Sequence, residues 1–308
     1  RIHGLIDELA DAGCLEISFS GGEALVHPHL EDFVRHARER RFAIRLKSNA
    51  ILLTPERARR LAEAGVYAVD VSVYGASPET HDAFTTVAGS FEKTLAGIRS
   101  AIDAGMKVAL SFCLTRHNAS EIPAMIAMSE ELGVRYTLDT QITARYDGTT
   151  SSLDHRVDRE TLDALYRGPL FSALGGPACV PDRDVQCSCA RTVAGISSSG
   201  ELYPCIGAPV PSGNLRDRSF QEVWASSPEL NHIRGLTMDD FSACQPCPNR
   251  SFCRRSSGVV YTNTGEYTGP EPFTCMEAGV IKAIAEDVES GAFQPPDAAP
   301  TEGGLHRC

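Results

Sequence analysis

Residues 15–50 read LEISFSGGEALVHPHLEDFVRHARERRFAIRLKSNA and contain the unit from which the first half of the chain is built. Leu15, Ile17 and Phe19 alternate with polar residues, as in a β-strand. The glycines at 21–22 end that pattern, an amphipathic helix is predicted from about residue 30, and a second apolar strand over 42–47. The stretch therefore predicts strand, turn, helix and strand.

The same unit recurs on both sides of this stretch. A helix is predicted over residues 2–9, with Gly13 as its stop, and Thr54-Pro55 is a typical helix start. Further strands are predicted over 68–74, 107–114 and 135–142, with helices over 91–104 and 122–132. Strict alternation of apolar strands with helices implies a buried parallel sheet with helices outside it.

The first visible element is a helix, so a right-handed crossover requires one more strand ahead of Arg1. We therefore expect the chain to lack its true N-terminus. Restoring that strand gives an α/β fold of six βα units, a partial (β/α)6 TIM-like barrel lacking its first strand. In such sheets the active site lies at the carboxyl ends of the strands.

The pattern changes near residue 148, after which the sequence is rich in loops and cysteine. Helices are predicted over 158–166 and 276–289. We expect a first domain over 1–150, a linker over 151–178, a second domain over 179–290 and a disordered Pro/Ala/Gly-rich tail over 291–308.

The net charge of the chain limits the kinds of partner that it can bind. The 308 residues carry a formal net charge of −11, which offers no overall basic surface to nucleic acid or anionic lipid. No apolar run approaches the ~20 residues of a membrane-spanning helix, and no secretory signal is visible. We therefore expect a cytoplasmic protein without nucleic acid or membrane as a partner.

Eleven cysteines are the unusual feature of the composition, and eight of them fall between Cys179 and Cys275. A disulfide scaffold would spread them through a small secreted chain. Here the long first half has only Cys14 and Cys113, which we expect to be buried apolar fillers. The eight clustered cysteines therefore favour a metal centre in a reducing compartment.

Gly21-Gly22-Glu23 closes the first visible strand at its carboxyl end. Two glycines permit backbone conformations and a close ligand approach that a Cβ would block. A carboxylate beside them can hold an ammonium group through charge-assisted hydrogen bonds. The turn has neither of the common glycine-rich phosphate-binding patterns.

In its context, EISFSGGEALVHPHL resembles the second strand of radical S-adenosylmethionine (SAM) enzymes. The resemblance implies that Gly21, Gly22 and Glu23 bind the amino group of the SAM methionine. Ser48 and Asn49 end the next strand, where the family often has Thr-x-Asn-Gly. Another resemblance, in DVSVYGASPETHD at 70–82, implies that Ser72 contacts the SAM ribose.

Some polar residues near these strand ends leave two interpretations open. His81 and Asp82 either belong to the SAM site or form a polar loop with a capping role. Arg145 and Asp147 follow the last strand, and they either contact SAM or substrate or form a salt bridge within their loop.

The clustered cysteines follow a long pattern: Cys189-x10-Gly200-x4-Cys205, then Cys244-x2-Cys247-x5-Cys253, then Cys275. Thiolates suit zinc and iron–sulfur clusters alike. A zinc ribbon would require paired CxxC knuckles, and only one such pair is present. The spacing therefore favours an iron–sulfur cluster over zinc.

This region resembles SPASM, the auxiliary-cluster domain of radical SAM peptide maturases. The resemblance rests on the cysteines and on SGELYPC and GNLRDRSFQEVWASSPELNHIR. It implies that one auxiliary [4Fe–4S] cluster is held by Cys244, Cys247, Cys253 and Cys275. Cys189 and Cys205 would join the other cluster. The cysteine that normally completes that second cluster is replaced by Ser257, so Cys187 or Cys179 would substitute, or one iron would remain open to substrate.

The resemblance implies a maturase that uses SAM and [4Fe–4S] clusters to make a 5′-deoxyadenosyl radical and modify a ribosomally made peptide or protein. A reductant protein and a peptide-recognition partner would accompany it. A sulfatase-type maturase is disfavoured, because Ile206 stands where those enzymes usually have a catalytic aspartate. The catalytic base stays unassigned.

The catalytic C-x3-C-x2-C motif is absent from the 308 residues. We expect it within roughly 30 residues upstream of Arg1, one βα unit away, and we expect these 308 residues alone not to cleave SAM. The alternative is a non-catalytic iron–sulfur electron carrier or peptide-binding scaffold on the same fold.

Overall fold

The computed structural model describes residues 1–173 and 188–296. Contacts divide the chain into two compact units, residues 1–140 with 219–221, and residues 141–218 with 222–308. Each unit is described by itself. No helix in the described ranges is both long and apolar enough to cross a membrane.

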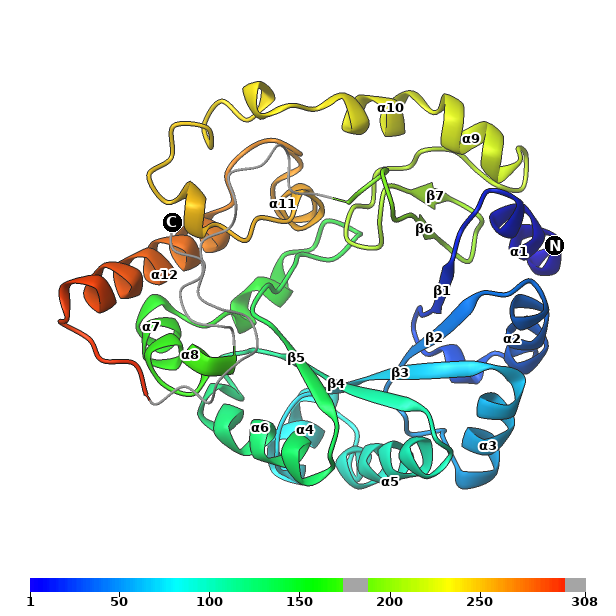
Figure 1. The fold of residues 1–308 in the computed structure, drawn as a ribbon, viewed down its shortest axis with the longest axis horizontal. Coiled ribbons are helices and arrows are strands. Elements are labelled where there is room, and N and C mark those ends of the chain that lie inside the picture. The colour runs from blue at the N-terminus through cyan, green and yellow to red at the C-terminus, as the bar shows by residue number, and fades with distance from the viewer. Residues whose placement is uncertain (174–187, 297–308) are drawn as a thin grey trace. The chain divides into compact units, whose positions relative to one another are not determined.

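The first unit is a parallel sheet whose five strands follow the order of the chain, β1-β2-β3-β4-β5. Helices α2, α3, α5 and α6 pack on one side of it (Figure 1). The elements of this unit are α1 (Ile2–Asp11), β1 (Glu16–Phe19), η1 (Ala24–Val26), α2 (Leu30–Glu39), β2 (Ala43–Ser48), α3 (Pro55–Ala64), β3 (Val66–Val73), α4 (Pro78–Thr85), α5 (Ser90–Asp103), β4 (Lys107–Cys113), η2 (Ala119–Glu121), α6 (Ile122–Glu131) and β5 (Arg135–Asp139).

The side-chain pattern of the strands explains the position of the core. In β2, β3 and β4 the residues that face the helices are almost all aliphatic and buried, among them Ile44, Leu46, Val69, Val71 and Leu110. Successive side chains point to opposite faces of a strand, so the alternate residues of the same strands form the other face. That face is polar and partly exposed.

The connection after β2 is closed by a tight contact with α5. Ala50 adopts a left-handed conformation, with φ of 60°. A Cβ built on Gly97 of α5 would lie 2.0 Å from the carbonyl oxygen of Ala50. Only glycine lets the helix approach this closely, so the carboxyl end of β2 is fixed against α5.

The second unit has short strands and several short helices before its long final helix (Figure 1). Helices α7 and α12 pack against each other. The elements are η3 (Ser151–His155), α7 (Arg159–Arg167), α8 (Leu170–Ala173), the antiparallel pair β6 (Gly195–Ile196) and β7 (Leu202–Tyr203), α9 (Phe220–Ser226), α10 (Pro228–Gly235), η4 (Met238–Asp240), η5 (Arg250–Phe252), α11 (Ser257–Thr264) and α12 (Pro272–Ser290).

The predicted fold class is confirmed, and its five visible strands occur in the predicted order. Two details were wrong. Leu15 was predicted to lie in a buried strand but precedes β1 and is 82% exposed. Cys14 was predicted to be a buried filler but is exposed, with its thiol donating to the Glu16 carbonyl oxygen. The proposed domain boundaries stay a prediction.

Candidate active site and metal centre

The Gly21-Gly22-Glu23 turn follows β1 and is held to the end of β2. The Glu23 carboxylate accepts hydrogen bonds from the Ser48 hydroxyl at 2.9 Å and from the backbone N–H groups of Asn49 at 2.8 Å and Leu25 at 2.9 Å. The structure therefore brings together all the residues predicted for SAM at the ends of these two strands.

The two glycines leave this turn open. Gly21 has a φ of +128°, a conformation that other residues rarely adopt. A Cβ on Gly21 or Gly22 would have no heavy atom within 4 Å beyond its chain neighbours. Among the described residues no cation pairs with Glu23. The turn thus combines free space with a carboxylate that has hydrogen-bond donors but no counter-ion.

Ser48 and Asn49 have local roles as well. The Ser48 hydroxyl accepts from the Ala50 backbone N–H, and the Asn49 side chain accepts from the Ile51 N–H. The Thr94 hydroxyl donates to the Asn49 carbonyl oxygen at 2.9 Å. This turn is therefore rigid, and the Asn49 side-chain oxygen is already engaged.

Ser72 lies on the polar face of β3, near its carboxyl end. Burial raises the pKa of Tyr74, and a hydrogen bond with the Ser72 side chain opposes part of that rise. His81 is 1% exposed; burial lowers its pKa, and its Nδ1 accepts from the Tyr74 N–H. A neutral His81 therefore supports the strand end.

Asp82 has the capping role. Its carboxylate accepts from the Gly89 and Phe91 N–H groups and from the Ser90 hydroxyl at the start of α5. These bonds, the Phe91 N–H first, hold the pKa of Asp82 below its ordinary value.

A second carboxylate at this end of the sheet was missed in the sequence. Glu121 accepts from the Ala76 N–H and from the hydroxyls of Ser77 and Thr80. Burial opposes its ionisation, but these donors outweigh burial and lower the pKa of Glu121. Its partners lie more than forty residues away, so sequence spacing gave no signal.

Arg145 and Asp147 belong to the second unit. The Asp147 carboxylate accepts from the N–H and the hydroxyl of Thr149, and Arg145 adds an attraction that further lowers the pKa of Asp147. Within its unit this pair stabilises its own loop.

Four cysteines predicted to form one set lie near one another in the second unit. Burial, together with the nearby Cys275 and Cys244, raises the pKa of Cys253 to about 11. Burial also raises the pKa of Cys275, as do Cys244 and Cys247. The donor set is therefore four mutually interacting thiols, which suits an iron–sulfur cluster.

The described residues contain no group of three or more His, Cys, Asp or Glu side chains arranged to hold a metal ion. A four-iron cluster is larger than one ion, and each of its cysteines binds a different iron. The thiols are thus neighbours without the tight convergence that a single zinc ion requires.

The other cysteine set is only partly described. The Sγ atoms of Cys189 and Cys205 lie 3.1 Å apart, and they would have to separate to ligate different irons of one cluster. Cys179 and Cys187 lie outside the described residues. Ser257 is 1% exposed and its hydroxyl contacts the Arg255 guanidinium. A Cβ on the next residue, Gly258, would lie 3.2 Å from the Cys205 sulfur, so the start of α11 does approach this set.

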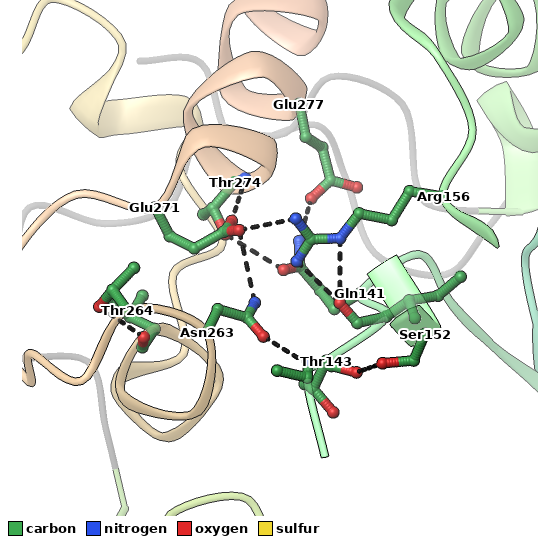
Figure 2. A network of polar contacts seen from close by, with 12 residues as sticks. Gln141, Thr143, Ser152, Arg156, Asn263, Thr264, Glu271, Thr274 and Glu277 are labelled. Carbon is green, nitrogen blue, oxygen red and sulfur yellow. Dashed lines mark hydrogen bonds and ion pairs between the residues drawn. The ribbon is translucent and has the colours of Figure 1, made fainter. Parts of the chain in front are cut away.

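Cys275 lies in the first turn of α12, which a buried polar network holds (Figure 2). The Arg156 guanidinium forms an ion pair with Glu271 at 2.9 Å and donates to the Ile142 carbonyl oxygen. Glu271 caps α12 by accepting from the Thr274 N–H at 2.7 Å. Burial opposes ionisation of Glu271, but the Thr274 donors and Arg156 outweigh it and lower its pKa.

The network continues along α12 and into the segment after β5. Glu277 accepts from the Gln141 side chain at 2.7 Å and from the Tyr166 hydroxyl at 2.8 Å. Asn263 of α11 contacts Glu271 and accepts from the Ala144 N–H. Three segments of the second unit are thereby joined around the residues that flank Cys275 (Figure 2).

Comparison with known proteins agrees with these two sites. The profile of the Radical SAM superfamily matches residues 1–128, and that of SPASM, an iron–sulfur cluster-binding domain, matches residues 187–249. The chain therefore contains a Radical SAM superfamily domain and a SPASM domain. SAM and [4Fe–4S] clusters are the cofactors of this class.

Among curated proteins, the chain is 28% identical to the AdoMet-dependent heme synthase of Methanosarcina barkeri, over 89% of this chain and 86% of that protein. It is 25% identical to the PqqA peptide cyclase of Granulibacter bethesdensis, over 95% and 82%. Among solved structures, Streptococcus suis SuiB bound to the precursor peptide SuiA superposes with a TM-score of 0.65 at 16% identity, over 89% and 68%. The last similarity concerns the fold.

Proposed function

We propose that this chain belongs to an enzyme that uses SAM to modify a peptide substrate. The observation that carries the proposal is the open Gly21-Gly22 turn beside Glu23, a carboxylate without a counter-ion at the carboxyl edge of a parallel sheet. SAM bears an ammonium group, which supplies the missing positive charge.

The proposed SAM-site residues have different roles. Gly21, Gly22 and Glu23 bind the methionine end of SAM, Ser48 and Asn49 hold Glu23 in place, and Ser72 contacts the ribose. Arg145 is a further candidate for the SAM site. When bound, SAM and a reduced [4Fe–4S] cluster supply hydrogen abstraction from the substrate. The protein contributes orientation and charge.

The cysteines hold the auxiliary clusters. Cys244, Cys247, Cys253 and Cys275 are the proposed ligands of one cluster, and their mutual interaction supports this set. Cys189 and Cys205 are the proposed ligands of the other, together with Cys187 or Cys179. Ser257 is buried beside this second set.

A peptide substrate is supported by the names of the PqqA peptide cyclase and of SuiB bound to its precursor peptide. The sulfatase type is disfavoured because Ile206 follows Cys205 and is 64% exposed, so no carboxylate stands there. The enzyme is proposed to be cytoplasmic and to receive electrons from a reductant protein.

The relative at 28% identity favours a second candidate, AdoMet-dependent heme synthesis. The test is anaerobic incubation of the protein, expressed from its natural start codon and reconstituted with iron and sulfide, with SAM and reductant. We expect 5′-deoxyadenosine together with a mass change in a peptide encoded beside the gene. A mass change in a tetrapyrrole, with none in the peptide, would favour the second candidate, and absence of 5′-deoxyadenosine would contradict both.

A matched pair of variants tests whether 5′-deoxyadenosine formation depends on the proposed SAM site. Glu23→Gln removes the negative charge but keeps an acceptor, and we expect it to abolish most 5′-deoxyadenosine formation. Glu31→Gln, at a half-buried carboxylate of α2 paired with Arg60, is the control and is expected to retain activity.

A further inference from the structure

The sheet face that is turned away from the helices carries small polar side chains in its centre. Strand register places Ser72 beside Ser111, and Ser111 beside Thr137. One row nearer the amino ends of the strands, Asp70 lies beside Ala109 and Ala109 beside Arg135. The side chains of Ala109, Ser111 and Thr137 are small, and charged residues lie beside them in the register.

Cations flank this centre on both sides. Lys47 lies beside Asp70 in the register, and Arg135 begins β5 two strands further on. Lys107 begins β4 on the same face, since it alternates with the buried Val108. Adjacent strands lie about 4.8 Å apart, so the rows place Arg135 roughly 10 Å from Asp70.

Two of these cations are not neutralised. Arg45 and Lys47 share Asp70, at 2.7 Å and 3.0 Å, and Arg45 also pairs with Glu16. In the described ranges of the chain, neither Lys107 nor Arg135 has an ion-pair partner, and both are exposed. The chain as a whole has a net charge of −11, so this positive region is local.

A bulge in β3 adds to the difference in charge pairing between the two sides of this face. The register between β2 and β3 shifts at Arg45, and the Tyr67 hydroxyl meets both Glu16 and Arg45 on this face. The carboxylates on the β1–β3 side of the face, Glu16 and Asp70, are therefore already paired. Asp139 lies on the same face at the carboxyl end of β5, two rows from Arg135, so only the amino ends of β4 and β5 keep the positive charge of Lys107 and Arg135.

We propose that Lys107 and Arg135 bind carboxylate side chains of an acidic segment of the peptide substrate on this sheet face. The inference rests on the proposed function and names the class of peptide. A carboxylate between two unpaired cations gains charge-assisted hydrogen bonds, and the small Ala109, Ser111 and Thr137 leave room for the peptide beside them.

The test measures binding without SAM cleavage, so its outcome is independent of the enzymatic activity. Fluorescence anisotropy of a labelled hexaglutamate peptide is recorded with the reconstituted protein, and hexaglutamine serves as the neutral probe. We expect hexaglutamate to bind, hexaglutamine to bind at least about tenfold more weakly, and added salt to weaken the former.

The variant Lys107→Gln/Arg135→Gln is expected to weaken hexaglutamate binding about tenfold or more. The control Lys93→Gln/Arg99→Gln removes the same two charges from exposed positions on α5 and should leave binding unchanged. Equal loss in both variants, or no loss in the first, would overturn the proposal. A tetracarboxylate porphyrin serves as a second probe. If it binds in a way that depends on Lys107 and Arg135 while hexaglutamate does not bind, the proposal that the ligand is a peptide is overturned.

Discussion

Two glutamates in this molecule each cap a helix, but they differ in burial and in how their charge is compensated. Glu271 caps α12, is 2% exposed and forms an ion pair with Arg156. Glu23 caps η1 and accepts from three donors, but no cation of the described chain pairs with it. The charge of Glu271 is therefore compensated within the protein, whereas that of Glu23 is available to a cationic ligand.

The residues near the two carboxylates agree with this difference in charge compensation. Glu271 stands four residues before Cys275 and holds the helical turn that carries it. Glu23 follows two glycines with open space beside them. One glutamate thus has a positioning role for a proposed cluster ligand, and the other has a proposed binding role.

The largest expected effect comes from the cysteine beside Glu271. Cys275→Ser should lower the iron content of the anaerobically reconstituted protein by about four atoms per chain, because one [4Fe–4S] cluster loses a ligand. Iron and sulfide analysis measures this. Cys14→Ser, at an exposed cysteine, is the control. Zinc as the sole metal in the unmodified protein would contradict the cluster assignment.

Removal of the counter-ion tests the role of Glu271. Arg156→Met leaves the buried Glu271 charge uncompensated and should lower the free energy of unfolding by about 3–5 kcal/mol. Urea denaturation measures it. In Arg156→Met/Glu271→Gln the charge is gone and the cap acceptor remains, so much of the loss should be recovered. Arg60→Met, at an exposed ion pair, should change stability far less, and an equal effect there would argue against the network.

The glycine turn is tested by two neighbouring substitutions. Gly21→Ala should lower the free energy of unfolding by about 1–3 kcal/mol, since φ of +128° is strained for alanine. Gly22→Ala has neither that strain nor a steric contact and should leave stability nearly unchanged. Both should weaken SAM binding in calorimetry. Unchanged SAM affinity in Gly22→Ala would show that SAM does not approach this backbone closely.

The smallest expected effect is a pH dependence from His81. Its pKa is lowered by burial, so the folded state binds fewer protons than the unfolded state. Stability is then constant above the unfolded pKa of about 6.5 and falls as the pH drops toward the folded value. His81→Gln should flatten urea midpoints across this window. If the urea midpoint of the variant showed the same pH dependence, that dependence would come from other titratable groups.

Much of the first unit followed from local patterns in the sequence. The predicted start of α3 at Thr54 is confirmed by the Thr54 hydroxyl accepting from the Arg57 N–H, because a capping bond is made within a few residues. The exposure of Leu15 was missed, since alternation of apolar residues does not state at which residue a strand begins. The predicted site residues at 21–23 and 48–49 are adjacent in the structure, and their role in SAM binding stays a prediction.

The sequence by itself determined the order of strands and helices, the glycine turn after β1 and the spacing of the cysteines, because each depends on neighbours along the chain. Only the tertiary structure decided which charges are compensated. The Arg156–Glu271 pair spans more than a hundred residues, Glu23 meets Ser48 across 25 residues, and Lys107 and Arg135 share a face only through strand register. Such contacts depend on packing and register, so Glu23 and Glu271, which both cap helices, differ in what their charge can bind.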